Sequence, residues 1–138
     1  MQVLFHDSAD DALFKFAVII ARYRGRWVYC KHWKRKTYEI PGGHREEGET
    51  IEQTARREFF EETGAKKYTL TPVCAYSVKD ENGESFGMLY YSDVEEFEAK
   101  LDCEIEKIYF LDAHPENQTY PLIQPLLVKE AERRGFIK

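Results

Sequence analysis

Three glutamates crowd the end of one predicted helix, in the stretch RREFFEETG that runs from Arg56 to Gly64. Glu58 precedes Glu61 by three residues and Glu62 by four, so all three lie on one helical face. Gly64 is a typical helix stop, and the negative end of the helix dipole disfavours acids there. A divalent cation would relieve this repulsion, because Mg²⁺ takes carboxylate oxygens together with waters and substrate phosphates.

A purely structural explanation also exists, since an acid-rich helix can keep its carboxylates on a solvated face. The segment 43–65 holds seven glutamates against three arginines, a net charge of −4 in a chain of −5. The gathering of acids on one side of the helix end favours the metal. So does the stretch KRKTYEIPGG upstream, because Pro41 and two glycines predict a loop whose carbonyl groups could converge on the same place.

The spacing of the fixed residues resembles the Nudix box, G-x5-E-x7-R-E-U-x-E-E-x-G-U, where U is a bulky aliphatic residue. Every fixed letter is present from Gly43 to Ala65, and the preceding EIPGG resembles the family's approach to the box. Phe59 and Ala65 stand where Leu, Ile or Val is more usual. The close match covers residues 39–65, and the order of strands and the terminal helix resemble the family more loosely.

The resemblance implies a Nudix-type α/β/α sandwich with a mixed β-sheet between helices, in which the box forms loop, helix and loop. It also implies hydrolysis of a nucleoside diphosphate linked to another group, with Mg²⁺ or Mn²⁺. The implied metal ligands are the backbone carbonyl of Gly43 and the side chains of Glu58, Glu61 and Glu62. Glu58 or a nearby acid would activate water. Arg57 would orient the glutamates through a salt bridge, and Glu49 would support the join between loop and helix.

Many members of the family add one acid from a later strand or loop. Glu104 lies six residues before Phe110, at a position where an aromatic residue is common, so it is the first candidate. Glu106 is the second candidate. Either could equally be an ordinary exposed strand glutamate. The implied catalytic set is therefore Arg57, Glu58, Glu61 and Glu104.

Substrate recognition is less readable, because aromatic residues serve cores as well as bases. Candidate platforms for a base are Trp33, Tyr38, Phe86 and Tyr90, and each could equally belong to the core. Asn117 could donate to a base edge or cap a turn. The basic run KHWKRK (31–36) could hold a phosphate or form a solvated loop. The histidines show no ligand spacing, and His44 is the one nearest the box.

A nucleoside triphosphate is the first expected substrate, cleaved to nucleoside monophosphate and pyrophosphate. Family analogy adds oxidised nucleotides such as 8-oxo-dGTP. Dinucleoside polyphosphates, nucleotide sugars and RNA 5′ ends stay open, and RNA is not favoured. A non-catalytic module that senses nucleotides is the competing class, but such proteins commonly lose box glutamates that this chain retains. An acidic helix with a chance match is the remaining alternative.

Elements that could position these residues can be read from hydrophobic patterning. Strands are expected at 14–22, 26–32, 68–79, 85–94 and 104–112. Thr50 and Gln53 predict a capping box, and a core stripe then continues to Gly64. A second amphipathic helix is expected at 126–135, with Pro125 in its first turn. Strands mixed with two helices predict a layered α/β or α+β fold.

Length and composition set the remaining bounds. The 138 residues predict one domain over 1–138, which the resemblance implies is a Nudix domain, and the net charge of −5 argues against a broad nucleic-acid surface. Three widely spaced cysteines offer no zinc pair or disulfide framework. The chain shows neither a signal-peptide pattern nor a long apolar run, so we expect a cytoplasmic protein without membrane contact. Dimers are common in the family, which leaves a homodimer open.

Overall fold

A computed structural model describes the backbone of residues 1–98 and 105–137 and the side chains of 1–98 and 108–137. Eight strands, two α-helices and one 3₁₀ helix are found in this part of the chain. In chain order they are β1 (Gln2–His6), η1 (Asp11–Leu13), β2 (Phe14–Tyr23), β3 (Arg26–His32), β4 (Gly42–His44), α1 (Ile51–Thr63), β5 (Ala65–Tyr68), β6 (Thr71–Asp80), β7 (Gly83–Phe97), β8 (Ile105–Leu111) and α2 (Gln124–Arg133).

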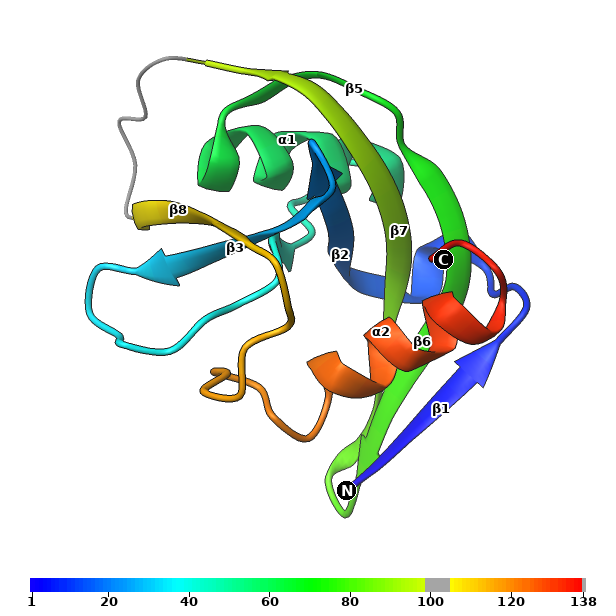
Figure 1. The fold of residues 1–138 in the computed structure, drawn as a ribbon. Coiled ribbons are helices and arrows are strands. Elements are labelled where there is room, and N and C mark those ends of the chain that lie inside the picture. The colour runs from blue at the N-terminus through cyan, green and yellow to red at the C-terminus, as the bar shows by residue number, and fades with distance from the viewer. Residues whose placement is uncertain (99–104, 138) are drawn as a thin grey trace.

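The described strands form one mixed sheet in the order β1-β6-β7-β2-β3-β8 (Figure 1). β2 and β7 run parallel, and the other printed strand pairs are antiparallel. Two short strands lie off this path: β4 pairs with β2, and β5 pairs with β7. β2 therefore supports the glycine segment that precedes α1.

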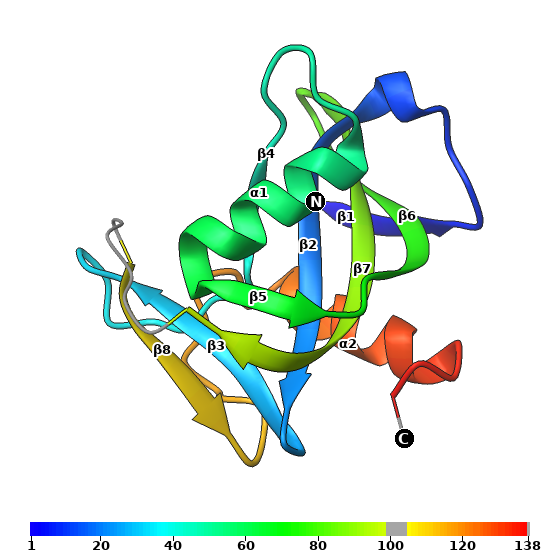
Figure 2. The same cartoon turned by 90° about the horizontal axis from the view of Figure 1, so that it is seen from above.

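Alternate residues of β2 enter two separate cores, one on each face of the sheet. Ala17, Ile19 and Ala21 pack in the core that holds the buried side of α1. Val18 and Ile20 pack in the core that holds the buried side of α2. Figure 2 shows the two helices on opposite sides of β2 and β7. The predicted α/β/α sandwich with a mixed sheet is confirmed.

Helix α1 begins and ends at the residues that the sequence indicates. The side chain of Thr50 accepts from the Gln53 N–H at 3.2 Å, and the Gln53 side chain accepts from the Thr50 N–H at 2.9 Å. Gly64 then takes a left-handed conformation (φ 75°), and its N–H donates to the Phe60 carbonyl at 2.7 Å. Both ends are thus fixed by local chemistry.

The other predicted elements are found, most of them with shifted bounds, and three strands were not predicted. β2 and β3 match their predicted ranges closely, while β7 extends three residues beyond its predicted end, to Phe97. The predicted loop at the glycines instead contains strand β4, and β1 and β5 were also missed. These short strands are held by backbone pairing, which leaves little hydrophobic pattern to detect.

No helix in the described part of the chain is both long enough and apolar enough to span a membrane. Cys30 and Cys74 are buried thiols rather than disulfide partners. Cys103 lies outside the described residues.

Two adjacent phenylalanines test how α1 is held to the sheet. Phe59 is 0% exposed in the core, whereas Phe60 is 47% exposed. We expect Phe59→Ala to lower the free energy of unfolding by about 3–5 kcal/mol, because it removes a buried ring and leaves a cavity. Phe60→Ala should change it by less than about 0.5 kcal/mol. Urea unfolding of both variants measures the difference, and equal effects would contradict the packing described.

Stability in acid should depend on Glu130 in α2. Its carboxylate accepts from Arg133 Nη2 at 2.6 Å and from Arg134 Nε at 2.7 Å. Hydrogen bonds from Arg133, then Arg134, lower its pKa to about 2. Because the folded pKa lies below that of the unfolded chain, its contribution is complete above the unfolded value and is lost as pH falls towards 2.

Glu130→Gln should therefore destabilise the protein at pH 6 and have much less effect near pH 2.5. Glu132→Gln is the control, because it removes the same charge from an exposed position of the same helix. Urea midpoints of the three proteins at both pH values give the comparison. A Glu130 effect that does not change with pH would contradict this assignment.

Candidate active site

The guanidinium of Arg57 joins the helix to the loop before it. Its Nε donates to Glu49 Oε2 at 2.6 Å, and Nη2 donates to Glu49 Oε1 at 3.0 Å. Nη2 also donates to the backbone carbonyl of His44 at 2.9 Å. These contacts lower the pKa of Glu49 to about 2, with the Arg57 hydrogen bond as the main cause. They also raise the pKa of Arg57.

The same guanidinium reaches the acids at the helix end. Nη1 donates to Glu58 Oε1 and, at 3.3 Å, to Glu61 Oε2. It also lies 3.6 Å from Glu46 Oε1. One cation thus offsets the charge of several carboxylates at the disfavoured end of the dipole.

Glu62 lies deeper than its neighbours and has a different partner. Its Oε1 accepts from the Gly42 N–H at 2.6 Å. Burial, together with the nearby Glu58, Glu39 and Glu61 carboxylates, raises the pKa of Glu62 to about 8. Burial also raises the pKa of Glu58. Both carboxyl groups have too little positive charge nearby to offset their burial, which is the condition that a bound cation would relieve.

Two consecutive glycines let β4 approach both the sheet and the helix. A Cβ on Gly42 would lie 2.4 Å from the Ala17 carbonyl oxygen, and one on Gly43 would lie 2.0 Å from Glu58 Oε2. Gly42 therefore allows close contact with the backbone of β2. Gly43 leaves room for the Glu58 carboxylate.

The ladder between β2 and β4 sets which backbone groups face the glutamates. The Pro41 carbonyl accepts from the Ile19 N–H at 2.8 Å, and the Arg45 N–H donates to the Lys15 carbonyl at 2.8 Å. Polar groups of alternate residues in a strand face the same side, so Gly43, midway between Pro41 and Arg45, also faces β2. Gly42 faces Glu62. The better candidate for a backbone ligand is therefore Gly42 rather than the expected Gly43.

The donor set suits a hard divalent cation. Glu58, Glu61 and Glu62 offer only oxygen atoms, which Mg²⁺ and Mn²⁺ accept. Within the described residues, no three His, Cys, Asp or Glu side chains are already arranged around one point that could hold an ion. Glu58 and Glu61 point to Arg57 instead. Binding of an ion thus requires these carboxylates to turn from Arg57.

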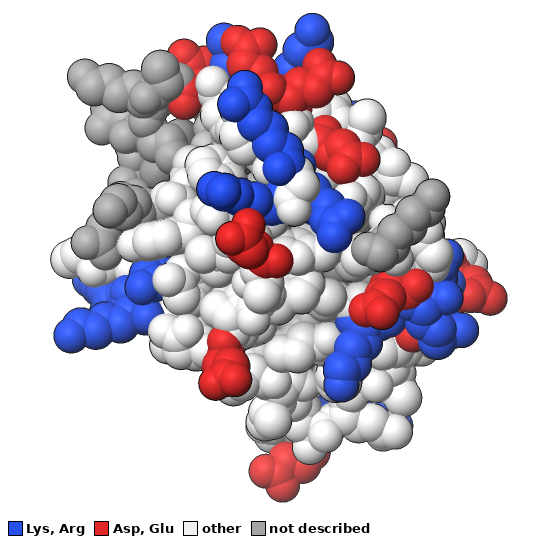
Figure 3. All heavy atoms as spheres, in the orientation of Figure 1, with Lys and Arg blue, Asp and Glu red and all other residues white. Residues whose placement is uncertain are grey.

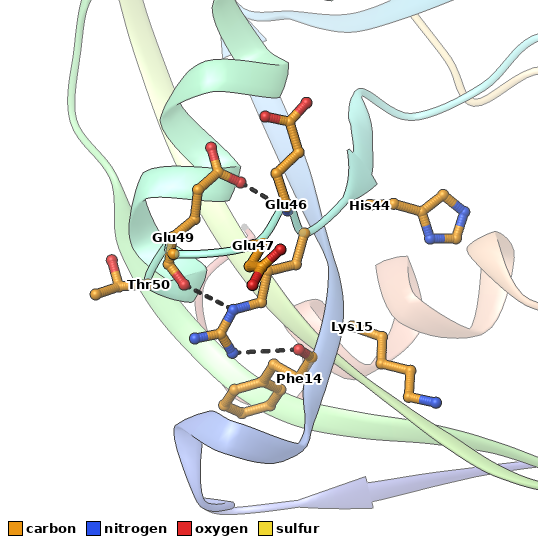
Figure 4. Close-up of a pocket in the computed structure, with 9 residues that line it drawn as sticks. Phe14, Lys15, His44, Glu46, Glu47, Glu49 and Thr50 are labelled. Carbon is orange, nitrogen blue, oxygen red and sulfur yellow. Dashed lines mark hydrogen bonds between the residues drawn. The ribbon is translucent and has the colours of Figure 1, made fainter.

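A second arginine fixes the loop between β4 and α1. Arg45 donates from Nε to the Glu49 carbonyl at 2.7 Å and from Nη2 to Asp11 Oδ2 at 2.7 Å. The Glu46 N–H donates to Glu49 Oε1 at 2.9 Å. Figure 4 shows this loop around an open hollow, with the side chains of Lys15 and His44 directed away from Glu49. The loop is therefore tied to η1 and to its own end.

A deeper pocket of about 660 Å³ lies next to the glutamates. Gly42 and Gly43 form part of its wall, so it opens onto the segment that contacts Glu58 and Glu62. Its apolar lining comes from Phe16, Ile40, Tyr76, Val78 and Ile123. Polar groups on the wall and rim include Lys15, Glu39, His44, Glu84, Tyr120 and Gln124.

None of the expected substrate-binding residues lines this pocket. Tyr38 packs against Tyr29 and Tyr109, Phe86 packs against His6, and Tyr90 is buried in the α1 core. Asn117 lies on the surface and donates to the Lys36 carbonyl at 3.4 Å.

Trp33 is 56% exposed within the basic run KHWKRK, where Figure 3 shows basic side chains gathered near the loop that follows β3. Glu104 lies outside the described residues, as does the side chain of Glu106.

Sequence reasoning missed Phe16, Tyr76 and Gln124 as pocket residues. Phe16 and Tyr76 lie on strands that were predicted from hydrophobic patterning, which does not show which side chains line a pocket. Gln124 begins α2 next to Pro125, and no pattern distinguishes it from a surface residue.

The chain matches known proteins over most of its length. A family model described as NUDIX domain matches residues 13–129. A Bacillus subtilis (strain 168) protein with the provisional name 8-oxo-dGTP diphosphatase YtkD is 33% identical over 102 residues. That alignment covers 74% of this chain and 64% of the relative, so it spans just under two thirds of the relative's length.

Solved structures show the same fold. A mutant form of the Bacillus subtilis pyrophosphohydrolase BsRppH superposes with a TM-score of 0.82 and 26% identity, covering 99% of this chain and 93% of that one. A C. elegans Ap4A hydrolase superposes with a TM-score of 0.64 and 18% identity, covering 86% of this chain and 97% of that one. At that identity the second likeness concerns the fold alone.

Substitution of the two glycines by alanine should affect different properties, activity for Gly43 and stability for Gly42. Gly43→Ala should displace the flexible Glu58 carboxylate, leave the fold intact and lower hydrolysis by about 10- to 100-fold. Gly42→Ala should collide with the β2 backbone and lower the free energy of unfolding by about 1–3 kcal/mol. Thermal melts and turnover assays of both variants separate the effects. Full activity in Gly43→Ala would contradict the placement of Glu58.

Proposed function

The chain belongs to the Nudix family. We propose that it hydrolyses a pyrophosphate bond and that its substrate is a nucleoside triphosphate, cleaved to a nucleoside monophosphate and pyrophosphate. Oxidised forms such as 8-oxo-dGTP belong to the same proposed class. The provisional name of the Bacillus relative supports that class.

One observation carries the proposal: a pocket with an apolar, aromatic lining opens onto the glycines that contact the acidic helix end. A base can pack against Phe16, which the buried Tyr76 supports, while the phosphates attached to its sugar reach Gly42 and Gly43. A volume of about 660 Å³ is within the range of small-molecule sites. Lys15 on the rim provides positive charge towards the phosphates.

The acidic residues then have a clear role. Glu58, Glu61 and Glu62 would hold one or more Mg²⁺ or Mn²⁺ ions, together with the backbone of Gly42. When bound, such an ion supplies positive charge that offsets the charge developing on phosphate oxygens. Arg57 keeps Glu49 and the loop in place while Glu58 and Glu61 turn towards the substrate.

Hydrolysis is an attack of water on phosphorus. The water oxygen forms a bond to phosphorus as the bond from that phosphorus to the bridging oxygen breaks. The bridging oxygen leaves with the other product. Glu58 is the proposed acceptor of the water proton, because its carboxylate lies beside Gly43 in the wall of the pocket.

The test is a panel of nucleoside triphosphates, 8-oxo-dGTP, dinucleoside polyphosphates, nucleotide sugars and 5′-triphosphorylated RNA, with Mg²⁺, Mn²⁺ or EDTA. We expect release of monophosphate and pyrophosphate from the triphosphates with either metal and none with EDTA. Chromatography identifies the nucleotide product, and a coupled assay measures pyrophosphate. Turnover confined to any other compound class would overturn the proposed substrate.

Glutamine variants assign the reaction to the helix end. Glu61→Gln and Glu62→Gln should abolish turnover with an unchanged circular dichroism melt, whereas Glu47→Gln, at an exposed loop position, should keep activity. Collapse of the fold in Glu62→Gln would give that residue a structural role instead.

A further inference from the structure

We propose that the Gln124 side chain makes the pocket selective for a 6-oxopurine, such as guanine or hypoxanthine, over a 6-aminopurine. The inference deepens the proposed function and rests on it, because it concerns the base of the same nucleotide. Gln124 is a specificity-determining residue in this account and takes no part in the chemistry.

The orientation of the Gln124 amide is fixed. The side chain is 6% exposed, and its Oε1 accepts from the Ile40 N–H at 2.8 Å. A rotation that exchanged the amide oxygen and nitrogen would place two donors against each other at Ile40. The oxygen therefore stays on the backbone, and the amide NH₂ is held on the other side.

That NH₂ group has two hydrogens to donate and no acceptor among the residues the structure describes. The amide nitrogen is not fully enclosed by protein atoms, and Gln124 lines the pocket. A molecule in the pocket can therefore reach it. A nearly buried donor without an acceptor is costly, so a ligand that fills the pocket must supply one.

The pocket also limits how a base can lie. The Phe16 ring contacts Tyr76 with ring centroids 5.6 Å apart, and it occupies the space where a Cβ on Gly87 would be, 2.2 Å from Phe16 Cε2. Tyr76 is 2% exposed, so this aromatic pair is firmly packed. Ile40 and Ile123 complete the apolar lining near Gln124. These contacts favour a planar ring system with one edge at the amide.

The edge of a 6-oxopurine matches the polar groups. Its O6 accepts from the Gln124 NH₂, and its N1–H can donate to a carboxylate. Glu39 precedes Ile40 and lines the same pocket, with Oε2 held by Arg35 at 3.1 Å. A 6-aminopurine reverses both groups: its NH₂ would face the amide NH₂, and its N1 would face the carboxylate. Sites built to hydrogen-bond a substrate reject such mismatches strongly.

Four triphosphates separate the effect of the group at position 6 of the purine from that of the group at position 2. Guanosine and inosine triphosphates share O6 and differ at the 2-amino group, whereas adenosine and 2,6-diaminopurine riboside triphosphates both carry a 6-amino group. We expect kcat/KM to be about 10- to 100-fold higher for the two 6-oxo compounds, whichever group stands at position 2. Equal values for inosine and adenosine triphosphates would overturn the inference while leaving the proposed function intact. No turnover of these four compounds or of 8-oxo-dGTP, with either Mg²⁺ or Mn²⁺, would refute the proposed function instead.

Two variants assign the preference to Gln124. Gln124→Glu keeps an acceptor for Ile40 and turns the other oxygen towards the base, so the ratio of inosine to adenosine triphosphate turnover should fall by at least about tenfold. Gln124→Met keeps the length without polar atoms and should lower that ratio, leaving only the contribution of Glu39. Titration of inosine and adenosine monophosphates into each protein gives a binding readout without turnover. A preference unchanged in whichever variant stays folded would contradict the assignment.

Discussion

The whole site depends on the ion pairs and hydrogen bonds between the Arg57 guanidinium and the groups around it. Five groups, Glu46, Glu49, Glu58, Glu61 and the His44 carbonyl, contact one guanidinium at the end of a helix where acids repel each other. The planar, permanently charged guanidinium has five N–H donors in a fixed arrangement and can bond several carboxylates at once, whereas a lysine has a single ammonium group. The contact with Glu49 fixes the loop, and the contacts with Glu58 and Glu61 hold ligands that can be released. The same residue therefore stabilises the protein and keeps the glutamates available.

The sheet fixes the position of the acidic helix end relative to the glycine segment before it. β2 contacts α1 through one face, α2 through the other and β4 along its edge. Gly42 brings β4 close to that strand, and Gly43 leaves space for Glu58. Pro41 and Ile40 continue the same segment to Gln124 at the start of α2. A short stretch of chain thus connects the acidic helix end to the proposed base pocket, so the proposed catalytic and recognition residues lie along one wall.

Helix α1 and the strands β2 and β3 were predictable because residues close in the sequence determine them. Thr50, Gln53 and Gly64 mark the helix by capping chemistry, and β2 and β3 contain the apolar runs 16–21 and 27–30. The acidic box could be found because its spacing is dense and specific. The pocket could not, because Phe16 and Tyr76 become neighbours only when β2 and β6 flank β7 in the sheet. The direction of the Gly42 backbone depends on the β4 ladder, and the orientation of Gln124 depends on a hydrogen bond across 84 residues.

The central claim is that the carboxylates at the end of α1 bind divalent metal. The most direct measurement is electron paramagnetic resonance of Mn²⁺, which counts free ions as the protein is titrated. The account predicts saturable binding that is lost in a protein carrying both Glu58→Gln and Glu62→Gln and kept in Glu52→Gln, a change in the first turn of the same helix. Saturable binding that survives the double substitution, or its absence from the unmodified protein, would contradict the claim.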